Sequence, residues 1–309
     1  MSAASIPTVS FEDFEAGGER RTRFVATLGQ GLEEFGFVFV CDHGVDEALL
    51  RRGYEAAQNF FALPDETKRR YERPEQGRQR GYTSFGVEHA KDRSVADLKE
   101  FWHVGRSLPD EHPLTRSGDI PSNSEVAEVT GFDADAAALF DALDRFSMSL
   151  LRAIELHLGF EEGYFARLTA DGNSVLRMIH YPPLPTEVPP GAVRAAEHED
   201  INLLTILPAS NEPGLELRTR AGQWLKIDPP PGTMVCDTGD MMQLLTGGRL
   251  PATTHRVVNP PDDRGRSRYS MPLFCHPHPD GVLQAATDGQ PAVTGRSFLM
   301  ERLRDNGVA

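Results

Sequence analysis

Two histidines and one aspartate in the order H-x-D…H are the residues of this chain best suited to chemistry. They are His198, Asp200 and His255. Two imidazoles and one carboxylate bind one face of a ferrous ion and leave the opposite coordination positions open for other ligands. Because side chains alternate along a strand with a period of two, His198 and Asp200 are expected on the same face. The pattern therefore predicts a catalytic metal site that a distant strand completes with His255.

The sequence around each ligand favours this metal site over a chance arrangement of surface polar residues. An isolated H-x-D pair is a weak signal in a chain with 10 histidines and 46 acidic residues. Here HEDINLLTIL reads as a buried strand after His198, and HRVV is a second short β-branched run that begins at His255. Both ligand segments are therefore expected to form strands.

A second pair of residues with the same spacing follows in the segment RYS. Arg268 and Ser270 would share one strand face, where a planar guanidinium and a hydroxyl can bind one carboxylate. Fe(II) held by two neutral imidazoles and one carboxylate carries a net charge of about +1, which favours a dianionic 2-oxo acid as chelator. Arg268 would neutralise the far carboxylate of that acid, and the remaining position on the iron is left for O2.

The elements that must position these residues change character near residue 175. Residues 1–174 are predicted to be mainly helical, with a long polar loop region at about 73–121, and residues 175–309 mainly strand, with a C-terminal helix. The expected helices span Arg20–Phe35, Asp46–Phe61, a short segment after Pro64, and Asp133–Leu158, whose apolar side is expected to back a sheet. Short strands between Pro and Gly turns after Val175 suit a jelly roll, and one catalytic unit is expected over 1–309.

From about Pro7 to about Leu303 the chain resembles the 2-oxoglutarate- and iron(II)-dependent dioxygenases of the isopenicillin N synthase-like superfamily. The matching stretches are FGFVFVCDHGV, RMIHYPPLP, HEDINLLTIL, GLELR, PPGTMVCDTGDMMQLLTGGRLPATTHRVV and RSRYSMPLF. The resemblance implies a double-stranded β-helix (jelly roll) core, mainly β with flanking helices, that uses Fe(II), 2-oxoglutarate and O2. It also implies that Tyr181 helps to hold the co-substrate. Many plant members carry Asn-x-Tyr here, but the Asn position of this chain is Ile179, which cannot donate a hydrogen bond.

The activity that the resemblance implies is oxidative decarboxylation of 2-oxoglutarate to succinate and CO2, coupled to hydroxylation, desaturation or ring closure of a small-molecule metabolite of the secondary-metabolism kind. Two other functions stay open. An oxidase of the isopenicillin N synthase kind would use the same triad and place an Arg-x-Ser pair on the substrate's own carboxylate, without 2-oxoglutarate. A non-catalytic metal-binding jelly-roll protein is the third, and succinate formation or ferrous chelation of 2-oxoglutarate would separate the three.

The prime substrate is expected to contact residues from two further segments. The family places loops from the region of LKEFWHVGR over the pocket mouth, which makes Phe101, Trp102 and Arg106 candidate substrate contacts. Core packing is the alternative for the two aromatic residues. Phe274 is a candidate for either the pocket wall or the barrel core. Four other histidines are expected not to bind iron: His43, His180, His276 and His278.

Composition bounds the partners and the compartment. The three cysteines, Cys41, Cys236 and Cys275, are too few and scattered for a disulfide framework or a zinc cluster, which is typical of the reducing cytoplasm. A formal net charge of -14 argues against nucleic acid or an anionic membrane as partner. No apolar stretch reaches the roughly 20 residues needed to cross a bilayer. We therefore expect a soluble cytoplasmic enzyme with a small-molecule substrate, while the sequence does not indicate an oligomeric state.

Overall fold

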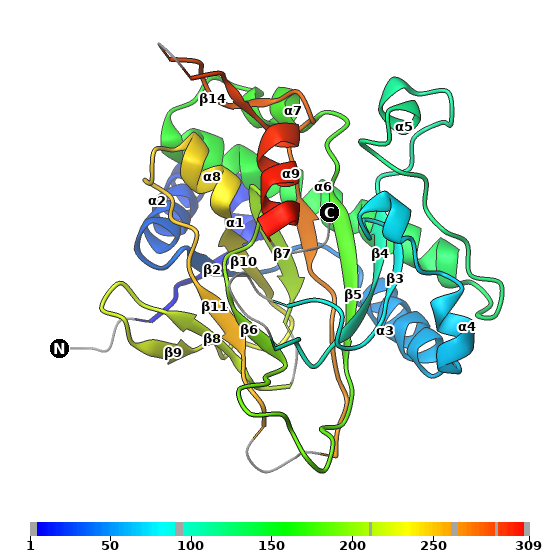
Figure 1. Ribbon diagram of the computed structural model, residues 1–309. Coiled ribbons are helices and arrows are strands. Elements are labelled where there is room, and N and C mark those ends of the chain that lie inside the picture. Colours follow the sequence, from blue (N-terminus) through cyan, green and yellow to red (C-terminus); the bar gives the residue numbers. More distant parts are fainter. Residues whose placement is uncertain (1–4, 90–94, 210–211, 261–264, 288–289, 306–309) are drawn as a thin grey trace.

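The two larger sheets of the fold lie against each other, with helices on the outer face of the largest one (Figure 1). The structure is a computed structural model that describes residues 5–89, 95–209, 212–260, 265–287 and 290–305. The helices are α1 (Phe11–Ala16), α2 (Gly18–Phe35), α3 (Glu47–Phe61), α4 (Asp65–Arg69), the 3-10 helix η1 (Pro74–Gln76), α5 (Pro113–Arg116), α6 (Phe132–Leu158), α7 (Tyr164–Thr169), α8 (Asp240–Leu245) and α9 (Gly295–Asp305).

The strands form a large sheet, a smaller sheet and a short pair. They are β1 (Thr8–Ser10), β2 (Phe37–Cys41), β3 (Gly81–Thr83), β4 (Glu100–Gly105), β5 (Val175–Tyr181), β6 (Ala195–His198), β7 (Leu204–Pro208), β8 (Leu215–Arg218), β9 (Trp224–Lys226), β10 (Met234–Thr238), β11 (His255–Val257), β12 (Arg268–Ser270), β13 (Leu273–Cys275), β14 (Val282–Gln284) and β15 (Val293–Thr294). The 9-stranded sheet has the order β1-β2-β10-β7-β13-β5-β4-β3, with β12 also paired to β5. The second sheet has the order β6-β11-β8-β9, and β14 pairs with β15.

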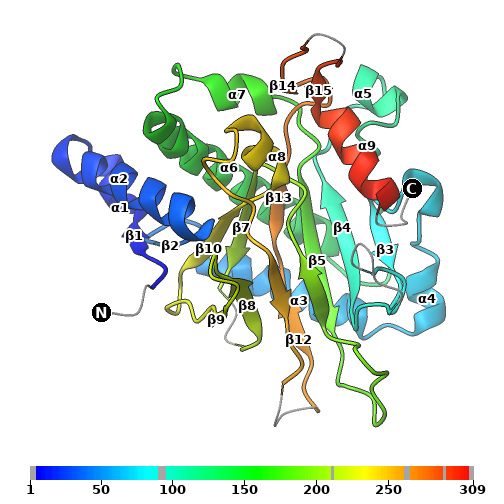
Figure 2. The same ribbon diagram turned by 60° about the vertical axis from the view of Figure 1, so that its left-hand side comes forward.

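Helix α6 backs the large sheet as its sequence pattern predicts. Leu139, Leu143 and Leu150 recur on one side of the helix and are completely buried, whereas Leu156 points outward and is 56% exposed. Figure 2 shows α6 and α3 passing behind the strands of the large sheet, and both helices contact it directly. This apolar layer fixes the outer face of the sheet and leaves the inner face for the site.

The predicted fold class, a jelly-roll core that is mainly β with flanking helices, is confirmed. The helix ends follow local signals: the Asp46 side chain accepts a hydrogen bond from the backbone N–H of Ala48 and caps α3, and Gly36 takes a left-handed conformation (φ 68°) at the end of α2. The large sheet extends across residue 174, because β2 and β4 from the first part of the chain pair with β10 and β5 from the second. The two parts therefore share one sheet.

Two strands differ from the sequence-based expectation. Strands β3 and β4 lie inside the stretch predicted as a polar loop, and β4 is buried along its whole length although it contains Glu100 and His103. Ion pairing makes this possible, because Lys68 Nζ lies 2.8 Å from Glu100 Oε2 in the interior. Strand β12 is separated from β13 by Met271 and Pro272, where proline has no N–H to donate to a ladder.

Candidate active site

A cavity of about 730 Å³ lies between the two sheets and contains the residues predicted to do chemistry. The large sheet contributes residues of β5, β7, β12 and β13 to its wall, and the smaller sheet contributes residues of β6, β8 and β11. Leu299, Arg302 and Leu303 of α9 line it as well. A jelly roll thus forms a pocket between its sheets with the C-terminal helix at one side.

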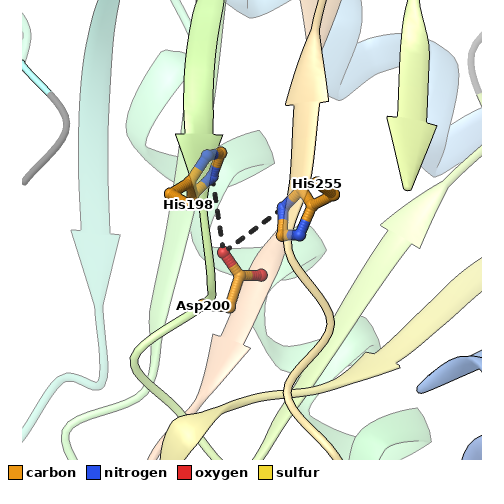
Figure 3. Close-up of side chains that lie close together, drawn as sticks. All are labelled: His198, Asp200 and His255. Carbon is orange, nitrogen blue, oxygen red and sulfur yellow. Dashed lines mark ion pairs between the residues drawn. The ribbon is translucent and has the colours of Figure 1, made fainter. Parts of the chain in front are cut away.

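His198, Asp200 and His255 come together in this cavity although 54 residues of sequence separate Asp200 from His255. Strand β11 pairs antiparallel with β6, and the register places His255 opposite His198. Asp200 Oδ1 lies 3.8 Å from His198 Nε2 and 3.7 Å from His255 Nε2 (Figure 3). Strand β6 ends at His198, so Asp200 reaches this point from the turn that follows and not from the strand that its spacing predicts.

Both imidazoles are held in the tautomer that a metal ion requires. His198 Nδ1 lies 2.7 Å from the carbonyl oxygen of Ala196, and His255 Nδ1 lies 3.1 Å from that of Thr253. A carbonyl only accepts, so each ring donates from Nδ1 and leaves the Nε2 lone pair toward Asp200. Burial, together with the neighbouring His255, lowers the pKa of His198 to about 4, which keeps that ring neutral. Two neutral nitrogens and one carboxylate oxygen suit Fe(II).

Two residues that sequence reasoning missed hold the Asp200 carboxylate in place. Thr205 donates its hydroxyl proton to Asp200 Oδ2, and Asn202 Nδ2 donates to Thr205 Oγ1 at 2.8 Å. Both are buried. The signal was available in principle, since HEDINLLT places these two polar residues inside an otherwise apolar run. Asp237, opposite Thr205 on β10, also faces the cavity, and burial together with Asp200 raises its pKa well above the ordinary value.

Arg268 is the second feature that points to a ligand. It is 2% exposed, and its Nε and Nη1 atoms have no hydrogen-bond partner within the described ranges. Ser270 follows at i+2 on β12, and both residues line the cavity as their spacing predicts. A buried guanidinium without a carboxylate partner is costly, so these donors fit an anionic group brought in by a ligand.

Strand β5 carries Tyr181, the tyrosine that the family resemblance predicts to hold the co-substrate. Tyr181 is opposite Arg268 in the ladder, and the guanidinium carbon of Arg268 lies 5.2 Å from its ring centroid. Ile179 is opposite Ser270, and both Ile179 and Tyr181 line the cavity. The structure therefore brings Arg268, Ser270 and Tyr181 to one end of the same pocket as the histidines.

The four candidate substrate contacts have different positions. Phe274 lines the cavity. Trp102 does not reach it, because it points to the opposite face of β4 and is completely buried between Phe60 and Phe132 at 4.7 and 5.2 Å between ring centroids. Arg106 is also outside the lining, since its Nη2 is held by Asp144 at 2.9 Å. Phe101 faces the cavity side of β4 but packs beneath other residues and does not itself line the pocket.

The other ionisable side chains of the described residues do not form a second metal site. Throughout the described part of the chain, the triad is the one group of three or more His, Cys, Asp or Glu side chains whose ligand atoms lie close enough to share a metal ion. His180 faces away from the cavity, with Nδ1 at 2.7 Å from Glu100 and Nε2 at 2.9 Å from Ser267. Among the described helices, none combines the length and the apolar character that crossing a bilayer requires.

Comparison with known proteins gives the same picture over most of the chain. A family model described as the 2OG-Fe(II) oxygenase superfamily matches residues 172–277, and one described as the N-terminal part of a non-haem dioxygenase in morphine synthesis matches residues 6–124. Among curated proteins, a 2-oxoglutarate-Fe(II) type oxidoreductase from Emericella nidulans is 29% identical over 91% of this chain and 82% of its own length. A proline hydroxylase from Petromyces alliaceus is 30% identical over 89% of this chain and 88% of its own length.

Solved structures match nearly the whole chain. A 2OG-Fe(II) oxygenase family protein from Caulobacter crescentus is 42% identical, with a TM-score of 0.86 over 98% of this chain and 100% of that one. A full-length Neurospora crassa protein in complex with alpha-KG is 26% identical, with a TM-score of 0.82 over 97% of this chain and 95% of that one. The similarity therefore includes both sheets and the helices that flank them.

Proposed function

The chain belongs to the 2OG-Fe(II) oxygenase superfamily, and from that premise we propose that His198, Asp200 and His255 hold the Fe(II) of an oxygenase that hydroxylates a small-molecule metabolite. Iron held by these three residues would supply the oxidising chemistry that couples decarboxylation of 2-oxoglutarate, to succinate and CO2, to oxidation of a C–H bond. The chain's own task is to keep both imidazoles neutral, fix the carboxylate between them and position the two organic ligands.

The observation that carries the proposal is the guanidinium of Arg268, which lies in the same cavity as the triad and whose Nε and Nη1 have no hydrogen-bond partner among the described residues. We propose that it binds the distal carboxylate of 2-oxoglutarate, with hydrogen bonds from the Ser270 and Tyr181 hydroxyls. Arg268 is buried, so the attraction is weakly screened and the co-substrate is held at one end while its other end faces the metal ligands. The alpha-KG present in the matching Neurospora crassa structure supports this use of the pocket.

The partner, the location and the kind of metabolite form the finer part of the proposal. A small-molecule partner is supported by the small molecules in the names of relatives and neighbours, such as thymine and proline. A cytoplasmic location is supported by three free cysteines, and the formal charge of -14 does not suit binding to nucleic acid or an anionic membrane. We propose a metabolite of the secondary-metabolism kind, and one catalytic unit in which both parts of the shared sheet contribute to the cavity.

Succinate formation tests this function. The wild-type protein given Fe(II), 2-oxoglutarate and air should release succinate, measured by NMR, and Asp200→Ala should release none while keeping its circular dichroism spectrum. Arg268→Ala should weaken co-substrate binding by about 2–5 kcal/mol, the cost of removing one member of a buried charged pair. Arg249→Ala, which removes a half-exposed guanidinium outside the cavity lining, is the control. Consumption of O2 by the wild type without any succinate would instead favour an oxidase of the isopenicillin N synthase kind.

A further inference from the structure

The end of the cavity away from Arg268 has a polar wall that the co-substrate does not explain. Along β5 the residues that face the cavity are Tyr181, Ile179, Arg177 and Val175. Tyr181 is opposite Arg268 in the ladder. Arg177 lies four residues further along β5, so its Cα is roughly 13 Å from that of Tyr181. Arg177 therefore belongs to the half of the cavity that remains for the prime substrate.

Phe274 connects this wall to the metal ligands. It is opposite Thr205 in the ladder between β13 and β7, and Thr205 is the residue that holds Asp200. The guanidinium carbon of Arg177 lies 5.3 Å from the ring centroid of Phe274. A group bound at Arg177 would thus have the Phe274 ring beside it on the side of the metal ligands.

The Arg177 guanidinium is fixed from three sides. Its Nε donates to His103 Nε2 at 2.6 Å, and its Nη1 lies 3.1 Å from Glu88 Oε1. The Phe101 ring supports its plane at 4.2 Å from centroid to guanidinium carbon. His103 accepts at Nε2 because its Nδ1 donates to the carbonyl oxygen of Arg78 at 2.9 Å, and burial together with Arg177 holds the pKa of this ring well below its usual range. The arginine is therefore preorganised, and Phe101 acts on the substrate end through it.

The charge on Arg177 is already neutralised within the protein. Glu88 Oε1 also accepts from Lys99 Nζ at 2.8 Å, and Asp97 Oδ2 lies 2.9 Å from the same nitrogen. Among the described residues, two cations and two anions therefore cancel at this wall, whereas Arg268 has no carboxylate partner there. The two ends of the cavity differ in the ligand charge that they favour: an anion at Arg268 and an uncharged polar group at Arg177.

One donor and one acceptor remain available at the neutral wall. Arg177 Nη2 and Glu88 Oε2 have no hydrogen-bond partner among the residues that the structure describes, and both side chains line the cavity. Glu88 Oε1, by contrast, is shared by two cations. A ligand that satisfies the pair must bring an acceptor to Arg177 and a donor to Glu88 from neighbouring atoms.

We propose that Arg177 and Glu88 bind an uncharged –C(=O)–NH– edge of the prime substrate, as found in cyclic amides, imides and ureides, with the ring packed against Phe274. This inference rests on the proposed function, because it assigns the substrate end of the same site. Arg177 donates to the carbonyl oxygen and Glu88 accepts from the N–H. A carboxylate of the same size is disfavoured, since it would meet the Glu88 charge without an unpaired cation to offset it.

The first test compares three probes of similar size on the wild-type protein. The probes are 2-piperidone, N-methyl-2-piperidone and cyclohexanecarboxylate, each titrated by ligand-observed NMR in the presence of Zn(II) and 2-oxoglutarate so that no turnover occurs and the Arg268 end is filled. The N–H of 2-piperidone should make it bind about tenfold more tightly than the other two, the effect of one hydrogen bond to a charged group. Equal binding of all three, or tighter binding of the carboxylate, overturns the proposal.

The second test changes the charge of the wall and measures how the preference between the uncharged and the anionic probe changes. Glu88→Gln leaves Lys99 and Arg177 with a single anion, so the ratio of the affinity for 2-piperidone to that for cyclohexanecarboxylate should fall at least about tenfold. Glu216→Gln removes a carboxylate that pairs with Arg256 at 2.8 Å outside the cavity lining, and this ratio should not change. An unchanged ratio in folded Glu88→Gln, verified by circular dichroism, overturns the proposal.

The two tests are separable from the proposed function and from a folding defect. The wild-type probe series decides the preference even if Glu88→Gln does not fold. Succinate release by the wild type from 2-oxoglutarate alone, without any prime substrate, tests the oxygenase itself. A protein that releases succinate but prefers the carboxylate probe would keep its proposed function and lose this substrate class.

Discussion

At the scale of single residues, Thr205 positions the Asp200 carboxylate of the proposed metal site. Its hydroxyl holds Asp200 Oδ2 while Oδ1 faces the two histidines. Thr205→Val keeps the shape and removes the donor, so the iron affinity should fall about 10- to 100-fold, as for other residues that orient a metal ligand. An anaerobic Fe(II) titration measures this, with Thr205→Ser as the variant that keeps the hydroxyl. Equal affinities for the two variants would contradict the assignment.

Tyr181 is predicted to be the weakest of the three co-substrate contacts, after Arg268 and Ser270. Ile179 occupies the place of an Asn donor and offers no hydrogen bond. A neutral hydrogen bond from the Tyr181 hydroxyl contributes about 0.5–1.5 kcal/mol. Tyr181→Phe should therefore raise the Michaelis constant for 2-oxoglutarate only several-fold, measured by succinate release. If the constant stays at the wild-type value, Tyr181 is only a packing residue of the cavity wall.

At the scale of elements, β4 depends on a buried ionic network. Glu100 accepts hydrogen bonds from Lys68 Nζ at 2.8 Å, from His180 Nδ1 at 2.7 Å and from the Tyr82 hydroxyl. Burial by itself would raise the pKa of Glu100, but these three partners lower it below its ordinary value of 4.5. A carboxyl whose pKa is lower in the folded state stabilises the fold above about pH 4.5, and this stabilisation is lost as the pH falls through the folded-state pKa.

Glu100→Gln should therefore destabilise the protein most at neutral pH. It leaves Lys68 as a buried cation without its main partner, which costs about 3–5 kcal/mol at pH 7. Below about pH 4.5 the difference in the free energy of unfolding between wild type and variant should shrink, as measured by urea denaturation at pH 7 and pH 4. Glu19→Gln changes a side chain that is 96% exposed and should show no difference at either pH. A gap that is the same at both pH values would rule out this role for Glu100.

At the scale of the whole molecule, the shared sheet predicts cooperative unfolding. The two tryptophans report on different regions, because Trp102 is in the core behind β4 and Trp224 is on β9 under the Arg256 guanidinium at 3.8 Å. Strands from both parts of the chain pair in the large sheet. Unfolding of either part would therefore expose the strand of the other part that pairs with it. Trp102→Phe and Trp224→Phe, each followed by its remaining fluorescence, should show coincident thermal transitions. Two separated midpoints would indicate independently unfolding parts.

The sequence by itself was sufficient to predict the triad, the Arg268 pair and the main helices. These features are local: an i, i+2 spacing on a strand fixes a shared face, as Arg268 and Ser270 show, and apolar residues at helical spacing fix the buried side of α6. His198 and His255 could be proposed as metal ligands from their segments. The pairing of β11 with β6, which places the two histidines opposite each other, came from the structure.

Only the tertiary structure decided which polar residues are buried and what they bind. Strand β4 reads as a loop because Glu100 and His103 interrupt its apolar residues, and their partners, such as Lys68, are distant in sequence. For the same reason the structure, and not the local pattern, sends Trp102 to the core and assembles Arg177 with Glu88 at the cavity wall. A buried charge is stable when another element of the fold places an opposite charge beside it. The packing of the elements determines whether that happens.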